Sequence, residues 1–261
     1  MTLQSILGKN YKWWYAIKYN FKLSYEYRMN LLIALVRFFI PVLTTYLIIY
    51  FTSSNKGYSD YILIASLFYQ VFAFTIGPSF DVTTDIMMST LTRYSLYPNS
   101  YFAWLFTRVI GINLYLLLAR LLLIYVSICI AGVNFSFAKI IPIAPYFLII
   151  ILIGFFIETI IGSLAFFYGR LNRNISQFYL DLMPLFSGSI FSFSVSSLLL
   201  PLSFLPTAYI SHHPMQIYLG KYSQLEILQT FVGGILWCLV LFILARIVFK
   251  AGLKRNEAVG L

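Results

Sequence analysis

Three ionisable side chains lie in the middle of long apolar segments: Arg37, Arg120 and Glu158. Glu158 stands twelve residues before Arg170, a distance of about 18 Å along a helix that rises about 1.5 Å per residue. Charges at such a depth in hydrocarbon are costly unless they are paired. We therefore expect an intramembrane charge network in which Glu158 pairs with Arg120 or Arg37. This network is either a structural clamp between helices or part of a substrate or proton path.

The other residues that could do chemistry form no recognisable active site. His212 and His213 precede Pro214, and adjacent histidines in a turn that ends in proline rarely face the same ion, so we expect no metal site. Cys129 and Cys238 both lie in apolar runs, where a thiol behaves as a small hydrophobic group, and we expect no disulfide. The sequence predicts no catalytic residue.

Motifs for nucleotide hydrolysis are also missing from the sequence. It contains neither the GxxxxGK[ST] phosphate loop nor the HExxH metal motif. We therefore expect that the chain is not an enzyme, that it holds no cofactor itself, and that any ATP is hydrolysed on another subunit.

Composition places these residues in a membrane protein. The 261 residues are 61% hydrophobic and 10% charged, with a mean hydropathy of +0.85, which is outside the range of soluble domains. Six segments reach the roughly 20 residues that cross a bilayer. The predicted fold is all-α, in a single transmembrane domain over residues 1–261, and the six spans begin near Met29, Tyr61, Tyr101, Ile140, Phe178 and Leu225.

The distribution of positive charge predicts the orientation of the spans. Of the 18 Lys and Arg residues, Lys56, Lys139 and Lys221 fall in predicted outer loops, Arg37 and Arg120 fall within spans, and the other thirteen fall on the opposite side. This asymmetry is typical of the positive-inside rule and predicts two cytoplasmic termini. The net charge of +10 is scattered at span ends and forms no basic groove, so we expect no nucleic-acid partner.

The longest polar stretch inside the chain is Asp81 to Asn99, DVTTDIMMSTLTRYSLYPN. The pattern predicts a short amphipathic helix whose first turn is capped by Asp81 or Thr83, with Asp85 near its positive end. Tyr97, followed by Pro98, is expected to stop the helix.

One face of this predicted helix is apolar. Met87, Leu91 and Tyr94 stand at i, i+4 and i+7 and form a single stripe. The stripe fits either an ordinary helix at the membrane surface or a docking element for the cleft of another protein.

Two further segments are unusual. A helical wheel of residues 1–27 has one apolar face, formed by Leu3, Leu7, Trp14, Ile17, Phe21 and Tyr25. This pattern predicts an amphipathic helix that lies in the membrane interface on the cytoplasmic side. Residues 184–220 are apolar but contain Pro201, Pro206 and Pro214. We expect short re-entrant helices on the extracytoplasmic side there, chiefly over 198–220, and an ordinary outer loop is the alternative.

The order of these segments resembles a known family. FKLSYEYRMNLLI, TTDIMMSTLTRYSLYPNSYFAWLFTRVIG, PLSFLPTAYISHHPMQIYLG and GLKRNEAVGL together resemble the membrane permease subunit of bacterial type-2 ATP-binding-cassette (ABC) exporters, in the six-span subgroup of about 260 residues. The resemblance covers nearly the whole chain.

The resemblance implies a function, partners and a location. It implies an ATP-driven exporter that moves an amphipathic drug, peptide or lipid-like substrate out of the bacterial cytoplasmic membrane. Its partners would be two copies of a cytoplasmic ABC ATPase, which carry ATP and Mg²⁺, a second permease that is identical or related, and the lipid bilayer. The helix of residues 81–99 would be the coupling helix, and the implied ATPase-coupling residues are Asp81, Asp85, Met87, Leu91, Tyr94 and Tyr97.

Two other classes of function stay open on the sequence alone. A self-contained secondary transporter would need a carboxylate near the midplane, which Glu158 supplies, and a pair of broken helices, of which only the segment 184–220 is present. A membrane enzyme acting on lipids would need several polar residues at one interface, and the pair His212 and His213 is too little.

Overall fold

The computed structural model describes residues 14–23, 26, 43, 47, 61, 64–65, 68–69, 77–91, 101–114, 136–190, 192–195 and 197–258. Every regular element within these residues is a helix, in agreement with the predicted all-α class.

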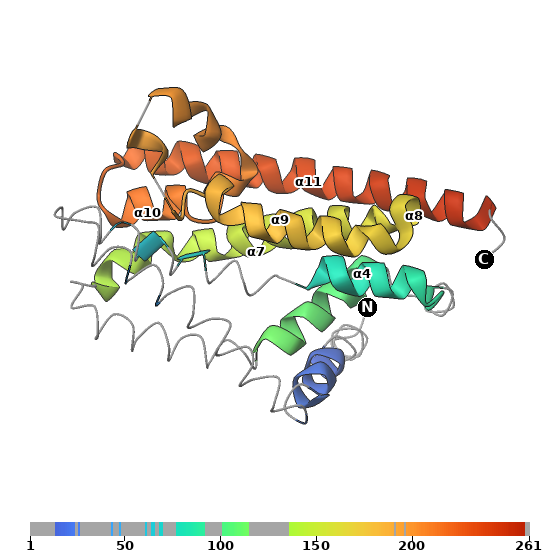
Figure 1. The fold of residues 1–261 in the computed structure, drawn as a ribbon. Helices are drawn as coiled ribbons and strands as arrows, with labels where there is room; N and C mark the ends of the chain where they lie inside the picture. Colours follow the sequence, from blue (N-terminus) through green and yellow to red (C-terminus); the bar gives the residue numbers. More distant parts are fainter. Residues whose placement is uncertain are drawn as a thin grey trace, which may run out of the picture.

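Two long helices, α7 (Ala144–Ser163) and α11 (Gln224–Ala258), run side by side through the molecule (Figure 1). Among the described residues, two helical stretches are long and apolar enough to cross a membrane, Ala138–Phe186 and Gln224–Arg255. The other predicted spans lie wholly or partly outside the described residues, so the six-span topology stays a prediction.

The outward face of α11 is apolar. Its exposed side chains include Leu225, Leu228, Val232, Ile235, Leu236, Leu239, Val240, Ile243, Leu244 and Ile247. An apolar face of this length, exposed in the part of the chain that the structure describes, fits contact with lipid or with another membrane helix.

Local signals fix where the long helices begin and end. Ser223 and Glu226 form a capping box at the start of α11, in which Ser223 N donates to Glu226 Oε2 at 2.7 Å. The predicted sixth span, which begins near Leu225, lies within α11, and this helix continues to Ala258. Gly169 turns the chain with φ 56°, and α9 begins shortly afterwards at Asn172.

The remaining elements are shorter helices around this pair. They are α4 (Pro78–Met87), Tyr101–Leu114, η2 (Phe137–Ile143), α8 (Ala165–Tyr168), η3 (Gly169–Leu171), α9 (Asn172–Phe186), η4 (Phe193–Val195), η5 (Ser197–Phe204), η6 (Pro206–Tyr209) and α10 (His212–Tyr218).

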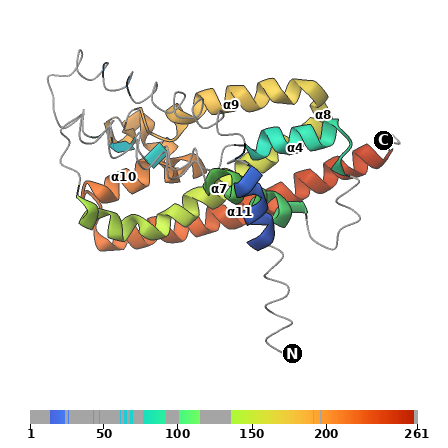
Figure 2. The ribbon, with the colours of Figure 1, turned by 90° about the horizontal axis from the view of Figure 1, so that it is seen from below.

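The short helices gather at the two ends of the bundle. In both views α4 and α8 lie near the C-terminal end of α11, whereas α10 lies near its N-terminal end (Figures 1 and 2). Lys139, which was predicted on the outer side, lies at the α10 end, where its Nζ stands 5.6 Å from the centre of the Tyr218 ring. The predicted coupling element and the predicted outer segment are therefore at opposite ends.

The proline-rich segment before α11 folds into η5, η6 and α10. All of α10 is buried, and Ser211, just before it, donates through Oγ to Ala65 O at 2.8 Å. Met215 and Tyr218 pack in one apolar cluster with Tyr61 and Tyr146. These contacts hold the segment against the bundle.

The N-terminal helix over residues 14–23 lies within the segment that was predicted to be an amphipathic helix, and its place in the cytoplasmic interface stays a prediction. Ile17 and Phe21 of the predicted apolar stripe are half-buried, whereas Trp14 is 63% exposed. The part of the stripe that is buried faces the helix Tyr101–Leu114, because Ile17 closely approaches Gly111. The other predicted members, Leu3, Leu7 and Tyr25, lie outside the described residues.

Candidate functional site

The predicted coupling helix is observed as α4, with different limits. It begins at Pro78 after Gly77, whose φ of 139° suits glycine, and it ends at Met87. The predicted cap by Asp81 or Thr83 is wrong: the backbone N–H of Asp81 already donates to Gly77 O at 2.9 Å, and Thr83 Oγ1 donates to Ser79 O at 2.6 Å. A proline in the first turn needs no N–H partner, which favours this earlier start.

Glu158 of α7 supplies the cap that the local sequence does not. Its Oε2 accepts hydrogen bonds from Ser79 N at 3.2 Å and from Ser79 Oγ at 2.5 Å, and its side chain is fully buried. A carboxyl oxygen at this position satisfies a first-turn N–H and lies at the positive end of the helix. Glu158 thus joins α7 to α4.

The predicted partners of Glu158 are not among the residues that the structure describes. Arg37 and Arg120 both lie outside them, so the predicted charge network stays a prediction. Ser79 was missed, and the only local signal was a serine two residues after glycine, at the end of an apolar run.

Asn172, the first residue of α9, makes a second connection to α4. Its Nδ2 donates to Thr83 Oγ1 at 2.8 Å and to Ile161 O of α7 at 2.9 Å. Asn172 is completely buried. One amide therefore links three helices, α4, α7 and α9.

Close packing brings α4 against α7 at Gly162. A Cβ built at Gly162 would lie 2.8 Å from Val82 Cβ, 2.9 Å from Ser79 Cα and 3.0 Å from Ser79 O. These separations are shorter than ordinary van der Waals contacts, so only glycine allows the two helices to approach this closely.

The two aspartates of α4 face the helix Tyr101–Leu114. Arg108 pairs with Asp81 at 3.0 Å and lies 3.9 Å from Asp85, whose Oδ2 also accepts from the hydroxyl of Tyr101 at 2.9 Å. Burial raises the pKa of the Asp81 carboxyl to about 6, although Arg108 opposes the rise. Asp85 is buried and Asp81 is partly buried, and through Arg108 both carboxylates hold α4 against Tyr101–Leu114.

The exposed part of α4 is its last turn. Met87 is 39% exposed and Met88 is 70% exposed, whereas Leu91 is partly buried in a cluster with Val82. A turn with Ser89 at φ 53° separates Met87 from Leu91, so the predicted continuous helix through both is wrong. Tyr94 and Tyr97 lie outside the described residues.

The histidine pair at the other end is engaged within the protein. His213 Nδ1 lies 2.9 Å from the hydroxyl oxygen of Tyr222, and its Nε2 lies 2.9 Å from Ser203 O. His212 Nδ1 is 3.5 Å from the hydroxyl oxygen of Tyr61. The described residues contain no group of three His, Cys, Asp or Glu side chains that could hold a metal ion. The two imidazoles fasten α10 to its neighbours.

Comparison with known proteins identifies the family. A family model described as ABC-2 family transporter protein matches residues 39–260. The chain belongs to this family. The ABC-2 family is the one that the sequence resembled, and that prediction is confirmed. A search of curated proteins finds no match.

Membership in the ABC-2 family sets the role of the chain. An ABC-2 membrane chain is the permease component of an ABC transporter, is embedded in the membrane and is not itself catalytic. It works with an ABC ATPase subunit. The connections of α4 to α7, α9 and Tyr101–Leu114 are therefore contacts within a permease.

Proposed function

We propose that this ABC-2 permease is the membrane subunit of an ATP-driven exporter and that α4 is the helix on which the ATPase acts. The observation that carries the proposal is the asymmetry of α4. Its first turns are tied to three other helices through Glu158, Asn172 and Arg108, and its last turn, at Met87 and Met88, is exposed.

This arrangement suits the transmission of movement. Glu158 fixes α4 to α7, Asn172 fixes it to α9, and Arg108 fixes it to Tyr101–Leu114. A force on the last turn of α4 would therefore move these helices together, and the permease would change between inward-facing and outward-facing packings. In this proposal two ATPase copies, which carry ATP and Mg²⁺, close against a pair of permeases.

In this proposal some of the predicted coupling residues contact the ATPase, and others hold α4 in position. Met87 and Met88 make contact with the ATPase, since flexible methionine side chains suit an apolar cleft. Asp81 and Asp85 are positioning residues that hold α4 through Arg108. Leu91 packs beneath the turn in the cluster that contains Val82.

The substrate and the location are proposed from the character of the bundle. In the proposal the substrate is amphipathic, such as a drug, peptide or lipid-like molecule, and the exposed apolar face of α11 is compatible with such a substrate as well as with lipid. In the proposal this substrate leaves the cytoplasm or inner leaflet of a bacterial cytoplasmic membrane, with both termini of the permease in the cytoplasm.

Purification from the native membrane in mild detergent tests the proposal. The wild-type permease is expected to bring with it a subunit that carries a phosphate-loop motif. The double variant Met87→Asp/Met88→Asp is expected to lose that subunit, because a charge at each exposed methionine opposes an apolar contact. Leu198→Asp is the matched control, since Leu198 is also exposed (83%) but belongs to η5 at the other end.

The outcomes separate the proposal from its alternative. Retention of the ATPase by the methionine variant would exclude the last turn of α4 as the docking surface. A permease that purifies alone and still transports, with transport abolished by an uncoupler but not by ATP depletion, would be a secondary transporter.

A further inference from the structure

The N-terminal helix over residues 14–23 has one face that the protein covers. Asn20 is buried, and the side of the helix with Ile17 and Asn20 lies against Tyr101–Leu114. A Cβ built at Gly111 would lie 2.7 Å from both Asn20 Cβ and Ile17 O. This contact fixes which side of the helix faces outward.

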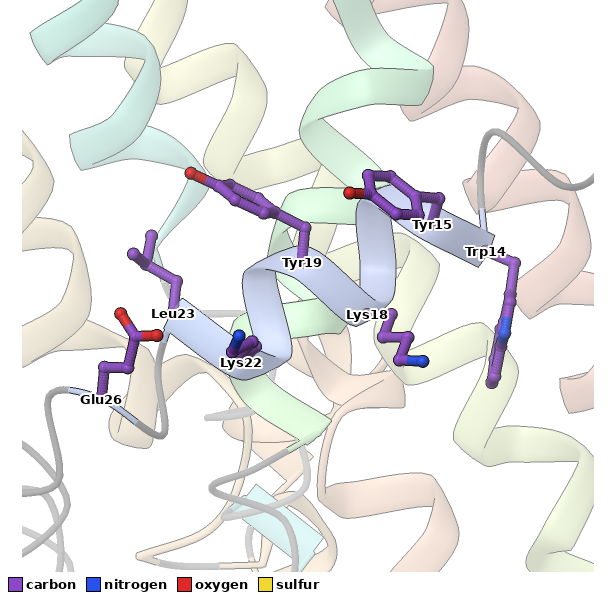
Figure 3. Close-up of a pocket in the computed structure, with 7 residues that line it drawn as sticks. All are labelled: Trp14, Tyr15, Lys18, Tyr19, Lys22, Leu23 and Glu26. Atoms are coloured by element: carbon purple, nitrogen blue, oxygen red, sulfur yellow. The ribbon is translucent and has the colours of Figure 1, made fainter.

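The outward side lines an open cavity of about 590 Å³. Trp14, Tyr15 and Tyr19 line it and are 63%, 61% and 59% exposed. Figure 3 shows Tyr15 and Tyr19 along one edge of the helix, and Lys18 and Lys22 on the other. The surface therefore combines aromatic rings with ammonium groups.

The charge of this surface is positive. Lys18 and Lys22 are one helical turn apart, and neither forms an ion pair with a carboxylate among the described residues. Glu26 also lines the cavity, so its three charged side chains sum to one positive charge. Two lysines one helical turn apart on the same edge of the helix can each supply ammonium donors to a phosphate group.

The position of the helix places this surface near the edge of the apolar region. Gly111, which the helix contacts, comes three residues after Arg108, whose guanidinium pairs with the aspartates of α4. Residues after Gly111 continue the apolar segment. Tryptophan, tyrosine and lysine concentrate at this boundary because their apolar bodies and polar ends meet both environments.

We propose that the cavity beside residues 14–26 binds the headgroup of an anionic phospholipid. Lys18 and Lys22 hold the phosphate, and Trp14, Tyr15 and Tyr19 pack along the glycerol and upper chain region. This site goes beyond the proposed coupling function and does not depend on it, because neither α4 nor an ATPase takes part in lipid binding.

Native mass spectrometry of the full-length permease tests the site. The protein, purified in mild detergent, is incubated with an equimolar mixture of phosphatidylglycerol and phosphatidylcholine that carry the same acyl chains. The wild type is expected to retain more phosphatidylglycerol. Lys18→Gln/Lys22→Gln is expected to lower the ratio of the two bound lipids by about fivefold per lysine, from a contribution of about 1 kcal/mol for each basic residue.

Two control variants distinguish a site from general surface charge. Lys250→Gln/Lys254→Gln removes two exposed lysines with the same spacing on α11, and it is expected to keep the wild-type ratio. Lys18→Arg/Lys22→Arg keeps the charge and is expected to keep the preference.

Two results would overturn the proposal. One is an unchanged lipid ratio in Lys18→Gln/Lys22→Gln, and the other is an equal loss in the two glutamine variants. Because the assay contains no ATPase, its outcome is separate from that of the co-purification experiment.

Discussion

Substituting Gly162 by alanine adds a single methyl group and so tests the close packing of α4 against α7. The new Cβ would lie 2.8 Å from Val82 Cβ and 2.9 Å from Ser79 Cα. Since the closest atoms include backbone, side-chain rotation cannot relieve the contact. To restore van der Waals distances, α4 must move away from α7, and this movement lengthens the hydrogen bonds from Ser79 to Glu158.

The expected loss of stability combines three effects. Overpacking costs about 1–3 kcal/mol, and each weakened hydrogen bond costs about 1 kcal/mol. Alanine offsets about 1 kcal/mol of this because it is a better helix former than glycine. The net destabilisation of Gly162→Ala is about 3 kcal/mol, which corresponds to a melting temperature lowered by about 6–12 °C in a protein of this size.

Thermal unfolding followed with a thiol-reactive fluorescent dye measures this change. Cys238 is buried, so in a permease that carries Cys129→Ala the dye reports the exposure of the Cys238 thiol as the bundle opens. Gly233→Ala on α11 is the matched control, because the atom that its Cβ meets most closely is the hydroxyl oxygen of Tyr209, at the end of a side chain. We expect the control to melt within about 2 °C of the wild type.

A second measurement links the joint to function. If α4 transmits movement to α7, Gly162→Ala is expected to reduce transport while the ATPase still co-purifies, because Met87 and Met88 stay exposed. The reasoning would be refuted by a Gly162→Ala permease with the melting temperature and transport rate of the wild type.

Two further predictions concern the polar contacts of α4. Glu158→Gln keeps an acceptor oxygen for Ser79 and is expected to lower the free energy of unfolding by under about 1 kcal/mol. Glu158→Ala leaves the buried Ser79 hydroxyl and N–H unpaired and is expected to lower it by about 2–3 kcal/mol. Equal melting temperatures for the two variants would contradict this assignment. Burial raises the pKa of Asp81 from 3.8 to about 6 in the folded state, so the folded permease binds more protons than the unfolded chain between these pH values. Its stability is therefore expected to fall as pH rises from about 4 to about 6, by at most about 3 kcal/mol, and melting curves of Asp81→Asn should lack this fall.

Several features of the site could be predicted from the sequence. The short polar stretch after Phe80 was predicted to be helical, and α4 occupies its first part. Glu158 was predicted to be buried within the membrane, either as a structural clamp or as part of a substrate or proton path. It is buried and joins α7 to α4 through Ser79, whereas its predicted partners, Arg37 and Arg120, lie outside the described residues. Both predictions depended on polarity along the chain, which is a local property.

The errors have a physical cause in long-range contacts. Asp81 and Thr83 are good capping residues, but Pro78 starts the helix earlier and Glu158 caps it from 79 positions away in the sequence. The predicted stripe failed at Ser89, where the chain turns with positive φ.

The sequence by itself determined that the chain is helical, apolar and a member of the ABC-2 family. Hydropathy and the order of segments depend only on which residues follow one another, and no long-range contact is needed to recognise them. Only the tertiary structure decided which polar groups meet. Asn172 reaches Thr83, and the N-terminal helix buries Asn20 against Gly111, because packed helices bring distant residues together. A buried polar group needs a hydrogen-bond partner. That partner can be far away in the sequence, so the spacing of residues along the chain does not reveal it.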